Sequence, residues 1–290
     1  MPSKRRKFSA FAKILLVLTL VCGLFVGGAY YVLTTFEPLD TREAPEPGCR
    51  LNLSNGRFDM EFEQARNAAT VGGVAFSRDL PQHAVTISYA TVWQESRFYN
   101  IEYGDRDSLG LFQQRPSQDW GEPEEIMDPV HSSRAFYDEL VEVHDWETIP
   151  VYEAAQRVQR SADGFAYDQH EALSERMAVT LGGDHGGMAT CWFDEETVEA
   201  LQTGEADIAG AQEQMARVFG TDPAELPLDQ DPATGDLGWA MAMWAVVHAE
   251  EYGLSSVTYD DMRWRASDGL DDAAAWTEVE DDTGGRVVLR

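Results

Sequence analysis

Residues 91–116, TVWQESRFYNIEYGDRDSLGLFQQRP, join the end of an apolar helical pattern to a segment rich in turn-forming residues. From Pro81 onward, apolar side chains cover too much of the helix surface for a solvent-facing helix, so we expect residues 81–96 to form a buried helix. Glu95 lies at the C-terminal end of this pattern. The segment 103–121 is dense in Gly, Asp, Ser and Pro, which predicts turns and short extended segments.

Glu95 is the candidate catalytic acid of the chain. An apolar environment favours the protonated form of a carboxylic acid, and the partial negative charge of a helix C-terminus acts in the same direction. A carboxylic acid that keeps its proton near neutral pH is what cleavage of a glycosidic bond requires. A lone glutamate at a helix end is more often a capping or surface residue, so the assignment depends on the residues around it.

The segment SLGLFQQRP, residues 108–116, follows Glu95 and Ser96 in an order and at a spacing that resemble the lytic transglycosylase and goose-type lysozyme superfamily. In that family a glutamate followed by serine ends a core helix, and a segment S/A-x-G-L-M-Q-x-x-P forms one wall of the glycan cleft. Phe112 stands where the family usually has methionine. The resemblance covers residues 49–181, and within it the chain is similar to exported, membrane-anchored lysozyme-like domains of actinobacteria.

The resemblance implies that Glu95 alone acts as acid and then as base, and that further residues contact the sugar. The later A-Y-N-A-G segment of the family corresponds loosely to VQRSA, residues 158–162, where the tyrosine and asparagine are absent. Core packing and a place beside the substrate therefore both remain open for Tyr167. The residues implied to bind substrate are Ser108, Gly110, Gln113, Gln159 and Tyr167.

The implied reaction cleaves the bond between N-acetylmuramic acid and N-acetylglucosamine in peptidoglycan strands, without a cofactor, and forms a 1,6-anhydro sugar. Most glycosidases use two carboxylates. Asp105 and Asp107 are the nearest candidates for a second one, which would permit simple hydrolysis, although aspartate in such a segment more often caps turns. The alternative function is a catalytically inactive scaffold that binds peptidoglycan for cell-wall synthesis or division proteins. The missing tyrosine and asparagine favour the scaffold, and the intact segment 110–116 favours catalysis.

An uncharged apolar run occupies residues 14–36 and is long enough for a helix that crosses a bilayer. Basic residues precede the run and acidic residues follow it, which predicts a single-pass membrane protein with a cytoplasmic N-terminus and an extracellular body. We expect a cytoplasmic tail at 1–13, an anchor at 14–36 and a linker at 37–48. A cleaved signal peptide is the alternative, but no A-x-A pattern follows the run.

The formal net charge of the chain is -29, which disfavours nucleic acid as a partner because phosphate backbones are repelled. Cys49 and Cys191 fall in the exported part, where a disulfide between them is chemically permissible; two buried free thiols are the other interpretation. The six histidines show no metal-ligand spacing, so no metal site is expected.

The fold class that we expect is mainly α, with a lysozyme-like α+β catalytic domain at residues 49–182 and a small α/β domain at 188–290. The glycine-rich residues 182–187 join them. In the second domain, GWAMAMW at 238–244 and VTYD at 257–260 weakly resemble tail modules of actinobacterial wall proteins, which implies an inert or binding module. Apolar patterns predict helices at 59–77, 81–96, 129–143, 151–161, 167–181 and 238–252, one or two helices over 195–219, and strands at 188–193, 256–259 and 287–289.

Overall fold

The structure, a computed structural model, describes residues 18–19, 23, 46–161, 165–226, 236–269, 276–280 and 283–290. Residues 47–290 form one compact unit, and residues 1–46 form another. Apart from Leu18, Thr19 and Gly23, the predicted anchor at 14–36 lies outside the described residues. No helix within the described residues is long and apolar enough to cross a membrane.

Helices make up most of the regular structure of the second unit, and the described strands form two small antiparallel sheets. The expected mainly α class is therefore confirmed. The helices are α2 (Phe62–Phe76), α3 (Gln82–Glu95), α4 (Pro123–Ile126), α5 (Pro129–Glu142), α6 (Val151–Gln159), α7 (Phe165–Asp168), α8 (Glu171–Leu181), α9 (Glu195–Thr203), α10 (Ile208–Phe219), α11 (Leu237–Val247) and α12 (Ala249–Tyr252). The strands are β1 (Gly48–Leu53), β2 (Gly56–Met60), β3 (Ala189–Trp192), β4 (Ser256–Tyr259), β5 (Met262–Arg265), β6 (Thr277–Glu278) and β7 (Val288–Leu289).

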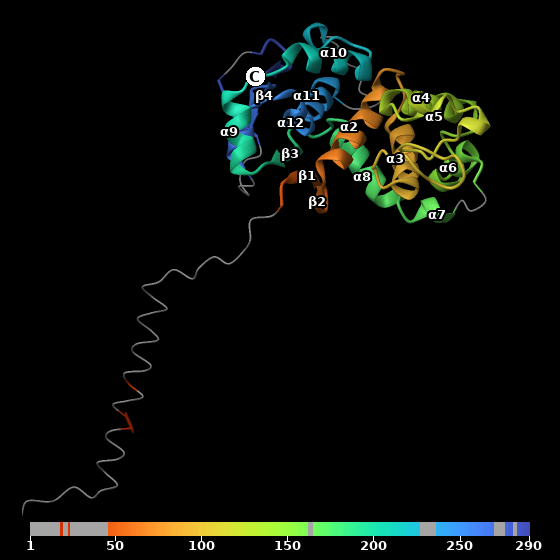
Figure 1. Ribbon diagram of the computed structural model, residues 1–290, viewed down its shortest axis with the longest axis horizontal. Coiled ribbons are helices and arrows are strands. Elements are labelled where there is room, and N and C mark those ends of the chain that lie inside the picture. The colour runs from red at the N-terminus through yellow and green to blue at the C-terminus, as the bar shows by residue number, and fades with distance from the viewer. Residues whose placement is uncertain are drawn as a thin grey trace, which may run out of the picture. The chain divides into compact units, whose positions relative to one another are not determined.

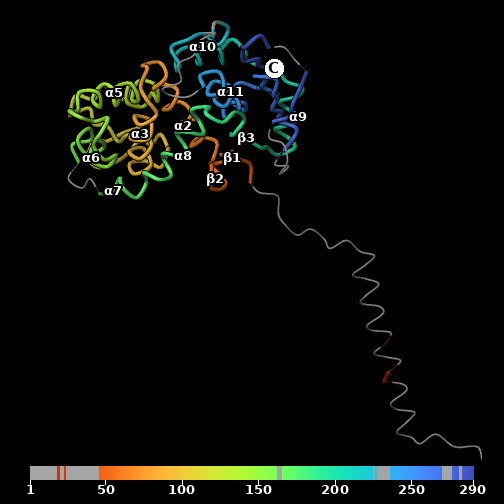
Figure 2. The backbone as a smooth tube through the Cα atoms, turned by 180° about the vertical axis from the view of Figure 1, so that it is seen from behind, coloured from red at the N-terminus to blue at the C-terminus, as the bar shows by residue number. Residues whose placement is uncertain are grey.

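Helices α2 and α3 form the centre of this unit. As predicted, α3 is buried along most of its length, and it lies among α2, α5, α6 and α8 in both views (Figures 1 and 2). Two adjacent glycines let other elements approach α2 closely. A Cβ atom at Gly72 would lie 2.6 Å from the Tyr89 hydroxyl of α3, and one at Gly73 would lie 2.5 Å from Val218 of α10. Larger residues at these two positions would push the helices apart.

The first sheet has the strand order β2-β1-β3, so a strand from residue 189 onward pairs with the first strand of the unit. Cys49 of β1 lies opposite Cys191 of β3, and the two form a disulfide. Both cysteines are fully buried. The predicted pairing is confirmed, and the alternative of two free thiols is wrong.

The C-terminal part packs directly on the N-terminal part. Every residue from Gly238 to Val247 in α11 is buried, and the Trp244 indole of this helix donates a hydrogen bond of 3.3 Å to the Thr70 hydroxyl of α2. The second sheet, of order β6-β5-β4-β7, lies beside α11. The predicted division into domains at residues 182–188 stays a prediction, and in the structure the two parts share a sheet, a disulfide and a hydrophobic core.

Three predicted helices have different bounds in the structure. The helix expected from Asp59 begins at Phe62, because residues 56–60 pair with β1 as a strand. The helix expected over 167–181 is divided into α7 and α8, and the one over 238–252 is divided at His248. The periodicity of the sequence could not show this strand, because residues 56–60 are a strand through their pairing with β1 and not through a local pattern.

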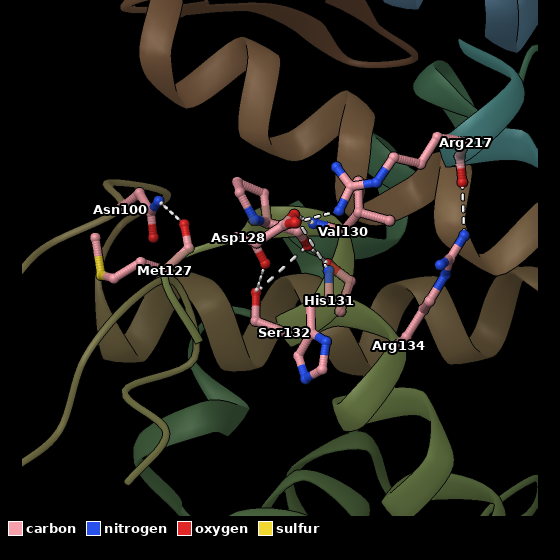
Figure 3. A network of polar contacts seen from close by, with 10 residues as sticks. Asn100, Met127, Asp128, Val130, His131, Ser132, Arg134 and Arg217 are labelled. Carbon is pink, nitrogen blue, oxygen red and sulfur yellow. Dashed lines mark hydrogen bonds and ion pairs between the residues drawn. The ribbon is translucent and has the colours of Figure 1, made fainter. Parts of the chain in front are cut away.

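A polar network joins α5 to α10 (Figure 3). Asp128 caps α5 by accepting a hydrogen bond of 2.9 Å from the Val130 amide, and it forms an ion pair with Arg217 of α10. Arg134 of α5 donates a hydrogen bond of 2.7 Å to the Arg217 carbonyl. Burial raises the pKa of the Asp128 carboxyl, but the hydrogen bonds from Arg217 and Val130 outweigh burial and lower it. The network therefore fastens the start of α5 to the C-terminal part of the chain.

Candidate active site

Glu95 is the last residue of α3 and is partly buried. After Ser96, the backbone makes a left-handed turn at Arg97 (φ 54°) and Phe98 (φ 65°), a conformation that costs energy for residues with a side chain. Two amide side chains of α2 hold the turn. Gln64 donates a hydrogen bond of 2.9 Å to the Arg97 carbonyl, and Asn67 donates one of 2.8 Å to the Phe98 carbonyl. The end of α3 is thereby held in place where Glu95 leaves the helix.

Two donors meet at one oxygen of the Glu95 carboxylate. The Tyr167 hydroxyl of α7 donates a hydrogen bond of 2.7 Å to Oε1, and the Gln159 amide of α6 donates one of 3.2 Å to the same atom. The same Gln159 nitrogen donates a hydrogen bond of 2.7 Å to the Phe112 carbonyl. Within the described part of the chain, Oε2 accepts no hydrogen bond. The site therefore orients Glu95 through one oxygen and leaves the other for a ligand.

The segment 108–116 is attached to the end of α3. The Ser96 hydroxyl donates a hydrogen bond of 2.7 Å to the Leu111 carbonyl, so the residue after Glu95 binds this segment directly. Leu109 and Gln114 form an isolated antiparallel bridge, which is the short extended element that the sequence predicts here. Phe112 is fully buried and stacks on Phe136 of α5 at a centroid distance of 4.6 Å. The aromatic ring at this position of the segment is thus part of the core.

The predicted substrate residues fall into two groups. Gln159 and Tyr167 contact Glu95. Because Tyr167 is only 1% exposed, its side chain binds the carboxylate from the protein interior and does not face solvent. Ser108 and Gly110 are buried within the 108–116 segment. Gln113 has a φ of 50°, and its side-chain amide nitrogen, Nε2, donates a hydrogen bond of 3.2 Å to the Gly110 carbonyl. Their contact with a sugar stays a prediction.

Gly110 has a φ of +74°, which favours glycine, and a Cβ atom there would lie 2.7 Å from the Ile126 carbonyl oxygen. Its amide donates a hydrogen bond of 2.8 Å to the Ile101 carbonyl. The glycine of the motif is therefore required by the backbone, whatever the segment binds.

The two candidates for a second carboxylate have other partners. Asp107 accepts hydrogen bonds from the Ser117 amide at 2.9 Å and from Arg115 Nε at 2.7 Å. The hydrogen bonds from Ser117 contribute most, followed by the one from Arg115, and together they hold the pKa of the Asp107 carboxyl well below its usual range. Asp105 is 90% exposed in its side chain and lies 3.8 Å from Arg106. Asp107 therefore serves the turn, the more common role considered for it, whereas the exposed Asp105 side chain has only this long ion pair among the described residues.

Several aromatic side chains near Glu95 belong to the core. Phe98 is fully buried, and Trp120 is 9% exposed. Trp93 is partly buried and makes an edge contact of 5.6 Å with Phe58 of β2. One exposed ring lies on α7, the helix that carries Tyr167, and it contacts the partly buried ring of Tyr152. Phe165, 72% exposed, stacks on Tyr152 at 4.9 Å.

Two further polar residues beside the site had no signal in the sequence. His170 lies before α8, and its Nε2 is 3.0 Å from Oε1 of Gln94, the neighbour of Glu95. Burial, with help from the charge of Arg97, lowers the pKa of the His170 imidazole. The ring is therefore neutral at neutral pH and presents a hydrogen-bonding edge rather than a charge. Only the packing of α8 against α3 brings these distant residues together.

Among the described residues, no group of three or more His, Cys, Asp or Glu side chains is arranged to hold a metal ion. The polar groups that meet at Glu95 are its own carboxylate, the amide of Gln159 and the phenol of Tyr167. No protein-family model matches the chain, and no curated protein is significantly similar to it.

Proposed function

We propose that the protein is a peptidoglycan lytic transglycosylase in which Glu95 is the catalytic residue. The observation that carries the proposal is the hydrogen bonding of Glu95, whose Oε1 accepts hydrogen bonds from Tyr167 and Gln159 while Oε2 has no partner among the described residues. The attachment of Ser96 to the 108–116 segment supports it, because the resemblance makes that segment one wall of the glycan cleft.

The two donors on Oε1 decide where an acidic proton resides. When Glu95 is protonated, the proton belongs on Oε2, because Oε1 already accepts hydrogen bonds from the Tyr167 hydroxyl and the Gln159 amide. Oε2 then donates this proton to the glycosidic oxygen between the two sugars as the bond from C1 breaks. The resulting carboxylate keeps both donors, which stabilise its negative charge.

The second step uses the same carboxylate as a base. Glu95 removes the proton of the muramic acid 6-hydroxyl, and O6 forms a bond to C1, so the product is a 1,6-anhydro sugar and no water is consumed. The hydrogen bonds that Asp107 accepts from Ser117 and Arg115 support this route over hydrolysis, since they hold one of the two candidates for the second carboxylate of an ordinary glycosidase in the turn.

The place of action belongs to the same proposal. The apolar run at 14–36 would hold the protein in the membrane as a single span, with the body on the outer side where peptidoglycan lies. The disulfide supports an exported body, because such bonds persist mainly in oxidising compartments.

The test is to incubate the complete chain with purified peptidoglycan and to identify the released fragments by mass spectrometry. Anhydro-muropeptides are expected, and Glu95→Gln should lower their release by about 100-fold or more, since it removes the acid and base. Glu142→Gln, at an exposed glutamate that is the last residue of α5, is the matched control. Fragments with reducing ends would indicate hydrolysis instead. Binding to peptidoglycan without any release would contradict catalysis and favour the scaffold.

A further inference from the structure

A pocket lies away from Glu95, toward the C-terminal end of α8. It has a volume of about 230 Å³, and its walls come from the β1–β2 turn, α8 and the glycine-rich residues 182–187. The polar lining consists of Glu175, Arg176, Thr180, His185 and Ser54. The volume fits an amino acid or the end of a peptide better than a large cofactor.

Arg176 is the unusual residue of this pocket. Its Nε atom is buried, and it finds no hydrogen-bond acceptor among the described residues. A buried polar group without a partner costs about 1–3 kcal/mol, and more when the group is charged, so such groups are rare in folded proteins. The chain carries 51 acidic residues against 22 basic ones, so carboxylates that could pair with an arginine are abundant. The terminal guanidinium nitrogens of Arg176 likewise have no acceptor among the described residues, so they are available for a ligand in the pocket.

Glu175 supplies the opposite charge. It lines the same pocket, its side chain is exposed, and the described residues give it neither an ion pair nor a hydrogen bond. A simple anion would meet Arg176 but be repelled by Glu175 and by the net charge of -29. A simple cation would be repelled by Arg176. A ligand with one carboxylate and one ammonium group satisfies both side chains.

We propose that this pocket binds a small zwitterion, the end of a peptide or an amino acid, through its carboxylate at Arg176 and its ammonium group at Glu175. A guanidinium binds a carboxylate with two parallel hydrogen bonds, and the hydroxyls of Thr180 and Ser54 add further donors in the pocket wall. Val179 and Met188 supply apolar contacts for a short side chain.

The distance to Glu95 gives this pocket a place in the proposed reaction. His170 contacts Gln94, the neighbour of Glu95, and Arg176 follows six residues later in α8, which is about 9 Å along a helix. Peptidoglycan carries short peptides on its muramic acid residues, and these peptides end in carboxylates and can carry free amines. This source of the ligand rests on the proposed function. The recognition of a zwitterion does not.

The test uses the complete chain and three small probes, the dipeptide D-alanyl-D-alanine, its C-terminal amide and its N-acetyl derivative, with binding followed by NMR. The free dipeptide should bind about tenfold or more tightly than either blocked form. Arg176→Met should abolish this preference for the carboxylate, and Arg176→Lys should restore part of it. Glu175→Gln should make the free and N-acetylated dipeptides bind equally. Arg66→Met, which removes an arginine of α2 that pairs with Glu250 and Glu251 of α12, should change nothing.

The outcomes separate this pocket from the Glu95 site. Equal binding of all three probes, or no saturable change at Val179 and Met188, overturns the inference even where Glu95-dependent release is observed. Zwitterion binding that survives Glu95→Gln supports the pocket. If the dipeptide binds and peptidoglycan is neither cleaved nor bound, the pocket assignment stands and peptidoglycan as the source of its ligand is overturned.

Discussion

The hydroxyl of Tyr167 donates a hydrogen bond of 2.7 Å to Oε1 of Glu95, although the two residues are 72 positions apart in the chain. Because the tyrosine ring is buried, the bond fixes the carboxylate from the protein side, and the other oxygen has no hydrogen-bond partner among the described residues. The residue closest to the proposed chemistry is thus positioned by a side chain that no substrate needs to touch.

Replacing this tyrosine should lower activity more than stability. Tyr167→Phe keeps the buried ring and removes the donor to Oε1. A hydrogen bond to a charged group contributes about 1.5–3 kcal/mol, so release of anhydro-muropeptides should slow by about 10- to 100-fold. Tyr152→Phe, which removes a hydroxyl from α6, is the control and should keep full activity. An equal loss in the two variants would mean that Tyr167 acts only through packing.

Gln159 should matter to both the site and the fold. Gln159→Leu keeps most of the side-chain volume but leaves the Phe112 carbonyl without its donor, and Glu95 loses a partner. We expect the free energy of unfolding to fall by about 1–3 kcal/mol, measured by urea denaturation. Gln169→Leu, which removes an exposed amide that binds Gln94, is the matched control and should cost less than half as much. Unchanged stability in Gln159→Leu would contradict the observed link.

The disulfide should make a large contribution to stability. It closes a loop with a sequence separation of 142 residues, for which the chain-entropy model gives about 5 kcal/mol as an upper value. Cys49→Ala with Cys191→Ala should therefore lower the free energy of unfolding by about 2–5 kcal/mol in the absence of reductant. Adding reductant should lower the wild type to a similar level. Cys22→Ala should be neutral, and a loss in that variant would point to a different pairing.

His248 should make stability depend on pH. Burial lowers the pKa of its imidazole to about 3 from the ordinary value of 6.5, while Nδ1 lies 2.8 Å from the Trp244 carbonyl. Between these two values the unfolded chain binds a proton that the folded chain does not. Stability therefore falls as pH falls from 6.5 toward 3, by up to about 1.4 kcal/mol per pH unit.

The measurement is urea unfolding at several pH values between about 4 and 8, a range that includes the ordinary pKa of histidine and much of the interval below it. His248→Phe should flatten the fall below pH 6.5, whatever its effect at pH 8. His144→Gln, at a side chain that is 87% exposed, should leave the wild-type slope unchanged. A slope in His248→Phe that equals that of the wild type would contradict the assignment.

A chain that ends at Gly187 should not fold as a cooperative unit. The truncation removes β3, its cysteine and α10, and it uncovers Gly73 of α2, against which Val218 and Phe219 pack. Thermal unfolding followed by circular dichroism should lose its sharp transition. A chain of the same end points that melts cooperatively near the temperature of the whole protein would support the predicted domain boundary at 182–188.

The sequence predicted the buried helix around Tyr89 and the position of Glu95 at its end, because a long apolar pattern followed by turn residues is a local signal. It could not show that Gln159 donates to both Glu95 and Phe112, since this depends on the way α6 packs against α3. The strand at 56–60 was missed for a related reason. Its pairing with β1 overrides a helical pattern that continues without a break into α2.

Cys49 is the second residue of β1, at the point where the chain enters the second unit. A pulling force that arrives from the N-terminal side therefore meets a covalent bond to β3 before it meets any hydrogen bond of the hairpin. Tension passing from residue 49 toward residues beyond 191 runs through the two sulfur atoms and bypasses the loop that contains Glu95. The segment that contains Glu95 thus lies on a covalent loop outside the shortest covalent path between the two ends of the chain.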